Sequence, residues 1–224
     1  MVKIDSLVFS YSTNSFRLTV PSLSIQPQEK LAIIGPSGSG KTSLLKLISG
    51  ILLPQQGQIS INNISVNSLP DARRRDFRIT NIGFIFQDFE LLDYLDTFDN
   101  ILHPYRISNA LKLTSETRNR VNALAHELGI KNKLKQMSGT LSQGEQQRTA
   151  ICRALLPKPK IILADEATGN LDPTNKTKIL EALFRSTEKN NATLIAVTHD
   201  HELLSHFDRV IDFKDYCTPE TEND

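Results

Sequence analysis

Eight consecutive residues combine glycines, a lysine and a hydroxyl in the order of a phosphate-binding loop: Gly35-Pro36-Ser37-Gly38-Ser39-Gly40-Lys41-Thr42. Glycines let successive backbone N–H groups point at phosphate oxygens, and the N-terminus of a following helix adds positive potential. Lys41 supplies a charge for the terminal phosphates, and the Thr42 hydroxyl suits Mg²⁺. The apolar run 31–34 predicts a strand before the loop, and the run that starts at Ser43 predicts a helix after it. Ser43 is counted with the loop residues as a predicted nucleotide contact. The segment predicts a nucleoside triphosphate site.

Two adjacent carboxylates, Asp165 and Glu166, follow a second apolar run, 161–164. Ligands of a parallel sheet bind at the carboxyl ends of its strands, so both acids are expected to face the phosphate loop. Asp165 is suited to hold Mg²⁺, and Glu166 can polarise an attacking water. The structural alternative is a capping pair before the next helix. Together with the phosphate loop, the pair predicts phosphoryl transfer to water or to another acceptor.

A third segment marks the start of a predicted helix and carries the sequence Leu141-Ser142-Gln143-Gly144-Glu145-Gln146-Gln147-Arg148. Ser142 is placed as N-cap, with Glu145 three residues on as its capping-box partner. Taken alone, this is a helix start. The segment also resembles the LSGGQ signature of the ATP-binding cassette (ABC) superfamily. The order of all the other motifs agrees with that resemblance, which covers about residues 2–213.

The resemblance implies roles for four further residues. Tyr11 lies where the family keeps the aromatic that stacks on adenine, although it also reads as an ordinary strand aromatic. Gln87 matches the glutamine that senses Mg²⁺ and the attacking water. Asp172 matches the D-loop, and His199 matches the histidine that holds the γ-phosphate. The resemblance therefore implies an ATPase with ATP and Mg²⁺ as cofactors.

Three departures from the family pattern occur near these motifs. Gln143 replaces a glycine of the signature, Glu145 replaces a glutamine, and Ala167 stands where relatives commonly carry proline. Ser142 and Gly144, which contact the γ-phosphate in the family, are retained, and Glu145 is counted with them as a nucleotide-binding residue. None of the departures removes a catalytic group, so activity is expected.

The short build and the segment 165–172 resemble the lipoprotein-releasing and macrolide-exporting subfamily. DNA-repair members carry a long coiled coil between the motifs, and translation-associated members join two cassettes, unlike this chain. The resemblance implies a head-to-tail homodimer around two ATP molecules that drives a separate integral-membrane permease. The alternative is a soluble regulatory ABC ATPase that is not coupled to transport.

The segment that follows Gln87 mixes large apolar side chains with acids. In the family this region receives a short cytoplasmic helix of the permease, and exposed apolar side chains often mark a partner groove. The residues predicted to line the groove are Phe89, Leu91, Leu92 and Tyr94. The alternative is that they pack the core of the helical subdomain itself.

Composition limits the other partners and the location. The 224 residues carry a formal net charge of +1, and the one compact basic run, 73–75, is expected to be a solvated face, so no nucleic acid is predicted. No apolar run approaches the ~18 residues of a membrane span, so no direct membrane insertion is predicted. Two cysteines are too few for a disulfide framework. We expect a cytoplasmic protein, peripheral on the inner face of the cytoplasmic membrane.

Positioning these residues calls for an α/β fold. Alternating apolar residues over 2–25 predict antiparallel strands, and strands that alternate with helices after residue 160 predict a parallel sheet. The fold class expected is a P-loop NTPase (RecA-like) core with a parallel sheet, an N-terminal antiparallel β subdomain and an inserted α-helical subdomain. The chain is predicted to be a single ABC ATP-binding domain, 1–224, with the helical insertion at about 88–157 and a flexible tail at 214–224.

Overall fold

A parallel sheet forms the centre of the computed structural model, which describes residues 1–11, 16–167 and 173–216. Its strand order is β6-β7-β8-β3-β9, and all neighbouring pairs are parallel. The strands, in that order, are β6 Ile82–Ile85, β7 Ile161–Asp165, β8 Thr193–Val197, β3 Lys30–Ile34 and β9 Arg209–Asp212. Every residue of β6, β7 and β8 is buried, as expected for apolar strands covered on both faces.

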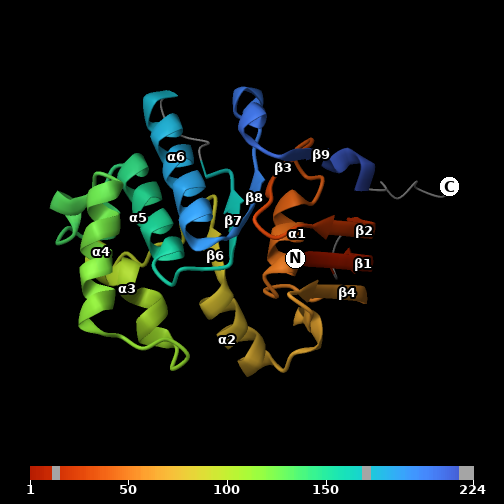
Figure 1. The fold of residues 1–224 in the computed structure, drawn as a ribbon, viewed down its shortest axis with the longest axis horizontal. Coiled ribbons are helices and arrows are strands. Elements are labelled where there is room, and N and C mark those ends of the chain that lie inside the picture. The colour runs from red at the N-terminus through yellow and green to blue at the C-terminus, as the bar shows by residue number, and fades with distance from the viewer. Residues whose placement is uncertain (12–15, 168–172, 217–224) are drawn as a thin grey trace.

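An antiparallel sheet lies at one end of the molecule (Figure 1). Its strands, in spatial order, are β2 Arg17–Ile25, β1 Val2–Ser10, β4 Gln56–Ile61 and β5 Ile64–Ser65. The inward residues of β1 skip a position between Ile4 and Leu7, both of which are buried. Ser6 has a φ of 48°, and the register with β4 shifts there, so a β-bulge returns the apolar residues to the same face.

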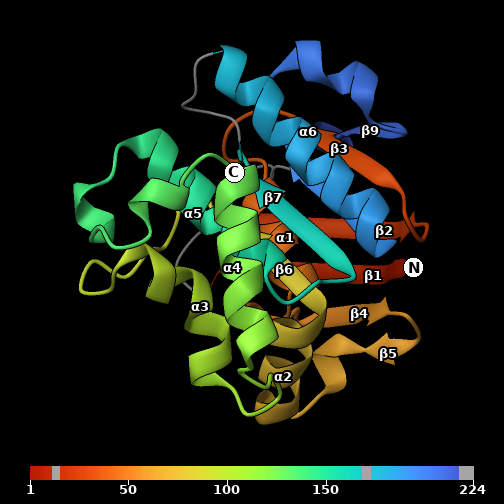
Figure 2. The same cartoon turned by 60° about the vertical axis from the view of Figure 1, so that its left-hand side comes forward.

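Helices cover the sheets and fill the opposite end of the molecule. They are α1 Lys41–Ile48, α2 Asp71–Asn81, α3 Thr97–Ile107, α4 Ser115–Glu127, α5 Gln143–Leu155 and α6 Pro173–Asn190. Two 3-10 helices, His201–His206 and Phe213–Tyr216, precede and follow β9. Both views show α3, α4 and α5 grouped together, and these helices lie between β6 and β7 in the chain (Figure 1, Figure 2). The two sheets and the helical group confirm the predicted fold class.

An apolar stripe runs along α4 and the residue that follows it. Val121, Leu124, Ala125 and Leu128 are all buried, and they belong to a core shared with α5 and the parallel sheet. Gly129 follows with a φ of 70°, the left-handed conformation that ends a helix. The helical group is thus packed onto the sheet that carries the predicted catalytic residues.

The basic run on α2 has a different role from the one expected. Arg73 and Arg75 are exposed, but Arg74 is half-buried, and its guanidinium donates to the carbonyls of Gly50 (3.1 Å) and Leu69 (2.8 Å). Arg78 adds a bond to the same Gly50 carbonyl at 3.4 Å. Gly50 follows the last turn of α1, so the arginines stabilise the end of the helix that follows the phosphate loop. A solvated face was therefore wrong for Arg74.

The C-terminal segment differs from the expected tail in its first residues. The predicted tail, 214–224, begins inside the 3-10 helix Phe213–Tyr216, whose Phe213 side chain is fully buried against the core. Residues 217–224 lie outside the described residues. Among the residues that the structure describes, no helix is long and apolar enough to cross a membrane.

Candidate nucleotide-binding and catalytic site

The phosphate loop joins β3 to α1, and its glycines adopt conformations that other residues resist. Gly38 and Gly40 have φ values of 78° and 97°. A Cβ at Gly40 would lie 2.6 Å from Cζ of Phe16. Gly40 is also the N-cap residue of α1, so no cap side chain occupies the first N–H groups of the helix. These groups are available to an anion, as the motif predicts.

The Lys41 ammonium lies inside the loop. Nζ donates to the carbonyl oxygens of Gly35 (2.9 Å) and Pro36 (2.6 Å), and the residue is only 6% exposed. The chain therefore places a positive charge beside the amides of the loop before any phosphate is present. This combination of a cation and open N–H groups suits a polyphosphate.

A cleft of about 430 Å³, here called the nucleotide cleft, brings many of the predicted residues together from five parts of the chain. It is lined by residues of the loop and of four other segments: Tyr11, Phe16, Ser37, Gly38, Gly40, Lys41, Thr42, Ser43, Gln87, Glu166 and His199. The ends of β3, β6, β7 and β8 meet here because parallel strands present their carboxyl ends at one edge. The arrangement suits attack of water on a bound triphosphate.

Glu166 and His199 contact each other across two neighbouring strands. His199 Nε2 lies 2.9 Å from Glu166 Oε1, and both side chains are partly exposed. Glu166 has a φ of 50°, and its N–H donates to the Val197 carbonyl at 3.1 Å. This strained backbone turns the carboxylate out of the strand and into the cleft. A carboxylate next to an imidazole is thereby placed in the cleft beside the phosphate loop, where the predicted general base is needed.

Asp165 is the buried member of the acidic pair, at 3% exposure. Its side chain is hydrogen-bonded to Thr42, while its Oδ1 atom is buried without a hydrogen-bond partner in the part of the chain that the structure describes. Burial raises the pKa of Asp165; the Thr42 bond lowers it and the Glu166 charge raises it. A buried oxygen without a partner, beside a threonine hydroxyl, fits a divalent cation such as Mg²⁺.

Replacing Asp165 with Asn is expected to stabilise the nucleotide-free protein, because it removes a carboxylate whose pKa is raised by burial, and to abolish metal-dependent turnover. Because the folded pKa is raised, ionisation of Asp165 costs stability as the pH rises above 3.8, its ordinary value. The gain should therefore be full near neutral pH and shrink as the pH falls toward that value. Urea denaturation at several pH values measures it. A gain that does not depend on pH would contradict the assigned cause.

Aromatic side chains form one wall of the cleft. Tyr11 is 38% exposed, its hydroxyl lies 3.0 Å from the Ser43 hydroxyl, and its ring meets Phe9 edge-on. Phe16 lies beside it, with ring centroids 6.0 Å apart. Tyr11 was predicted to contact the nucleotide, whereas Phe16 was only one of the apolar residues of the strands predicted over 2–25. An aromatic residue just ahead of the second strand was the signal for Phe16, and spacing does not distinguish it from a core residue.

The signature segment forms the predicted helix start. The Ser142 N–H donates to Glu145 Oε2 at 2.9 Å in a capping box, and Glu145 Oε1 lies 3.2 Å from Lys133 Nζ. The bond to the Ser142 backbone, with further help from Lys133, lowers the pKa of Glu145. Ser142, Gly144 and Glu145 do not line the nucleotide cleft of their own chain. Asp172 lies outside the described residues.

The residues that depart from the family pattern, Gln143, Glu145 and Ala167, leave the capping box at the start of α5 intact. Gln143 is exposed at the first position of α5. Ala167 is buried, and its carbonyl accepts a hydrogen bond from the Gln147 side chain. This bond joins α5 to the residue that follows Glu166. The helix that begins at the signature therefore contacts the segment that follows β7, next to Glu166.

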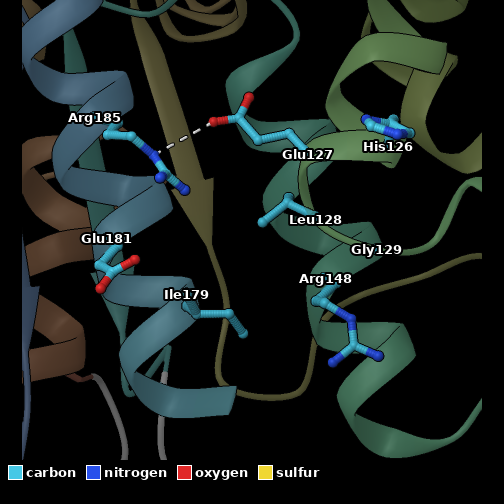
Figure 3. Close-up of a pocket in the computed structure, with 8 residues that line it drawn as sticks. All are labelled: His126, Glu127, Leu128, Gly129, Arg148, Ile179, Glu181 and Arg185. Carbon is cyan, nitrogen blue, oxygen red and sulfur yellow. Dashed lines mark ion pairs between the residues drawn. The ribbon is translucent and has the colours of Figure 1, made fainter. Parts of the chain in front are cut away.

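A second cavity, of about 400 Å³, lies between α4 and α6 (Figure 3). Glu127 of α4 and Arg185 of α6 face each other across it, and their charged atoms are 3.7 Å apart. Both side chains are about half exposed, so this pair contributes little to stability. The cavity shares no residue with the nucleotide cleft and is not the predicted site.

Comparison with known proteins decides the family. The sequence model of the family described as ABC transporter matches residues 18–169, which include the phosphate loop, the signature segment and the acidic pair. The chain belongs to the ABC transporter ATP-binding family. The matched range thus joins the phosphate loop, Gln87, the signature segment and the acidic pair in one family match, while Tyr11, Asp172 and His199 lie outside it.

Two curated relatives agree with the subfamily suggested by the motifs. The chain is 35% identical over 223 residues to a lipoprotein-releasing system ATP-binding protein, LolD, of Maricaulis maris, covering 98% of this chain and 96% of that protein. It is 40% identical over 195 residues to the macrolide export ATP-binding/permease protein MacB of Rhodopirellula baltica, covering 87% of this chain and 28% of that protein. This ABC ATPase is therefore of the lipoprotein-releasing and macrolide-exporter type.

A solved structure supports both the fold and the activity. The ATP-binding cassette MJ0796, in a dimeric post-hydrolysis state bound to ADP and Pi, is 32% identical with a TM-score of 0.87. The match covers 95% of this chain and 94% of that one. The ABC ATPase described here binds and hydrolyses ATP as the nucleotide-binding subunit of a transporter. The alternative of a regulatory cassette without transport is not favoured.

Proposed function

We propose that this ABC ATPase works as a Mg²⁺-dependent head-to-tail homodimer that encloses two ATP molecules and drives a separate integral-membrane permease. One observation carries the proposal: the chain holds a complete phosphate loop and a complete signature helix, yet Ser142 and Gly144 do not line its own cleft. A second copy would supply those residues. The dimeric state of the similar cassette MJ0796 supports this arrangement.

Within each cleft, each residue has a role in binding or hydrolysis that follows from the chemistry of its side chain. Tyr11 offers a ring for adenine, and the loop amides with Lys41 bind the phosphates. Glu166 polarises the attacking water, and His199 holds both the Glu166 carboxylate and the γ-phosphate. Gln87 senses the metal and the water. Across the dimer, Ser142, Gly144, Glu145 and Asp172 complete the contacts.

Mg²⁺ would be held by the Thr42 hydroxyl and Asp165, with Gln87 as a third ligand. The buried Oδ1 of Asp165 without a protein partner supports this assignment. When bound, the ion neutralises phosphate charge. The Thr42 bond to Asp165 already places the two oxygen ligands next to each other.

The permease is proposed to dock on the segment after Gln87, which would place this cytoplasmic subunit peripherally on the inner face of the cytoplasmic membrane. Phe89, Leu91 and Leu92 are half-buried, and Tyr94 is 74% exposed. The buried Asn100 holds the segment by accepting from the Leu92 N–H (2.9 Å) and donating to the Leu92 carbonyl (3.0 Å). A fixed backbone that carries three partly exposed apolar side chains and one exposed tyrosine suits a partner helix.

Tyr94→Glu tests this docking surface because the side chain is exposed and its loss should not unfold the chain. We expect capture of an integral-membrane protein from detergent-solubilised membranes to be lost, while the ATPase activity of the isolated protein is unchanged. Ile107→Glu is the matched control, since Ile107 is 63% exposed at the end of α3, outside the proposed groove. Retained capture by Tyr94→Glu, or loss of its ATPase activity, would favour the helical-core alternative.

A further inference from the structure

Two residues just after Gln87 hold an unusual backbone conformation. Phe89 and Glu90 have φ values of 60° and 51°, the left-handed region that disfavours residues with a Cβ. Neither is glycine or asparagine, so the local sequence does not favour this shape. Such a conformation persists where surrounding contacts hold it, and it is typical of functional segments. The segment therefore needs an external restraint.

Arg153 supplies that restraint from α5. Its Nη1 donates to the Glu90 carbonyl and its Nη2 to the Phe89 carbonyl, both at 2.5 Å. A guanidinium presents its N–H groups as a rigid fork, so one side chain fixes both carbonyl directions at once. Arg153 is half-buried, and burial lowers its pKa to about 10, which leaves it charged at neutral pH. Both hydrogen bonds are therefore charge-assisted.

Because α5 begins at the signature and ends near Arg153, one rigid helix joins two parts of the site. Ser142 caps its first turn, and Arg153, in its last turn, holds Phe89 and Glu90, which follow Gln87 by two and three positions. We infer that Arg153 is a positioning residue that sets the place of Gln87 in the nucleotide cleft and links it to the signature helix. The inference rests on the proposed role of Gln87 at the metal and the attacking water.

The test compares Arg153→Met with Arg120→Met. Arg120, on α4, is a matched control because its guanidinium also donates to two backbone carbonyls, those of Leu156 (3.1 Å) and Leu155 (3.3 Å), away from the Gln87 segment. Arg153→Met is expected to lower kcat by about 10- to 100-fold, the range for misplaced catalytic groups, and to raise the Mg²⁺ concentration for half-maximal activity. Its Kd for ATP should be unchanged. Arg120→Met should lower the Tm but leave the Mg²⁺ dependence as in the unmodified protein.

A second-site change separates positioning from general stability. Glu90→Gly removes the penalty of the left-handed backbone, so in the Arg153→Met background it should restore part of kcat and of the Mg²⁺ dependence. If Arg153→Met only destabilised the fold, glycine at position 90 would not restore kcat or the Mg²⁺ dependence. If Arg153→Met cannot be purified, Arg153→Lys replaces it, since lysine keeps the charge but loses the fork. An unchanged Mg²⁺ dependence in that variant overturns the inference.

Gln87→Ala distinguishes failure of this inference from failure of the proposed function. If Gln87→Ala shifts the Mg²⁺ dependence but Arg153→Met does not, Arg153 does not position Gln87. If Gln87→Ala leaves the Mg²⁺ dependence unchanged, the proposed role of Gln87 is wrong, and the inference fails with it. Equal shifts in both variants, and no larger shift in the double variant, support the inference.

Discussion

Glu166→Gln is expected to lower kcat for ATP hydrolysis by about 10²–10⁴-fold while leaving the Kd for ATP unchanged. Glutamine keeps a carbonyl oxygen where Glu166 Oε1 accepts from His199 at 2.9 Å, so the geometry of the cleft should survive. What it loses is the basic carboxylate that polarises water. Phosphate release under saturating Mg-ATP measures kcat, and a fluorescent ATP analogue measures binding.

The same variant tests the proposed homodimer. Because ATP is bound but not consumed, the closed form should accumulate, and light scattering after gel filtration should show a dimer with ATP and a monomer without it. Glu116→Gln, a change on the exposed first turn of α4, is the control and should leave turnover intact. Turnover by Glu166→Gln at the unmodified rate would refute its role. A strictly monomeric ATP-loaded protein at high concentration would count against the sandwich.

Lys41→Met is expected to weaken ATP binding by about 10- to 100-fold. Hydrogen bonds to charged groups contribute about 1.5–3 kcal/mol, and 1.4 kcal/mol is a factor of ten in Kd. The loss falls on binding because the Lys41 ammonium already lies within the loop, 2.9 Å from the Gly35 carbonyl and 2.6 Å from that of Pro36. Titration calorimetry with a non-hydrolysable ATP analogue measures the change.

The control for Lys41→Met is Lys3→Met, which removes one positive charge from an exposed position on β1. Its Kd should match that of the unmodified protein. The rise in Tm on adding ATP should be lost only in Lys41→Met, since stabilisation by a ligand follows its concentration relative to Kd. An unchanged Kd in Lys41→Met would mean that the loop amides alone bind the phosphates.

Local patterns in the sequence predicted most of the secondary-structure elements of the fold. The apolar runs 31–34 and 161–164 became β3 and β7, and the alternating apolar residues over 2–25 became β1 and β2. The capping box of the signature segment formed as predicted. These features depend on residues within a few positions of one another, where backbone preference and side-chain periodicity decide the outcome.

The contacts that were not predicted from the sequence join residues far apart in the chain. Phe16 lies against Gly40, Arg74 donates to Gly50, and Arg153 holds the Phe89 carbonyl. An arginine on a helix or a phenylalanine in a strand has several ordinary roles. Nothing in its neighbours along the chain distinguishes them, because the contacts form only after the helices pack.

The sequence by itself determined the nucleotide and the class of reaction: the phosphate loop, the Asp165–Glu166 pair and the signature segment indicate ATP binding and hydrolysis through residue types that have few substitutes. The tertiary structure decided their relative places. The order β6-β7-β8-β3 brings Gln87, Glu166 and His199 to the loop, and the packing of α5 turns the signature away from the cleft of its own chain. Strand order and helix packing follow from burying apolar faces over the whole chain, a global condition that local spacing does not express.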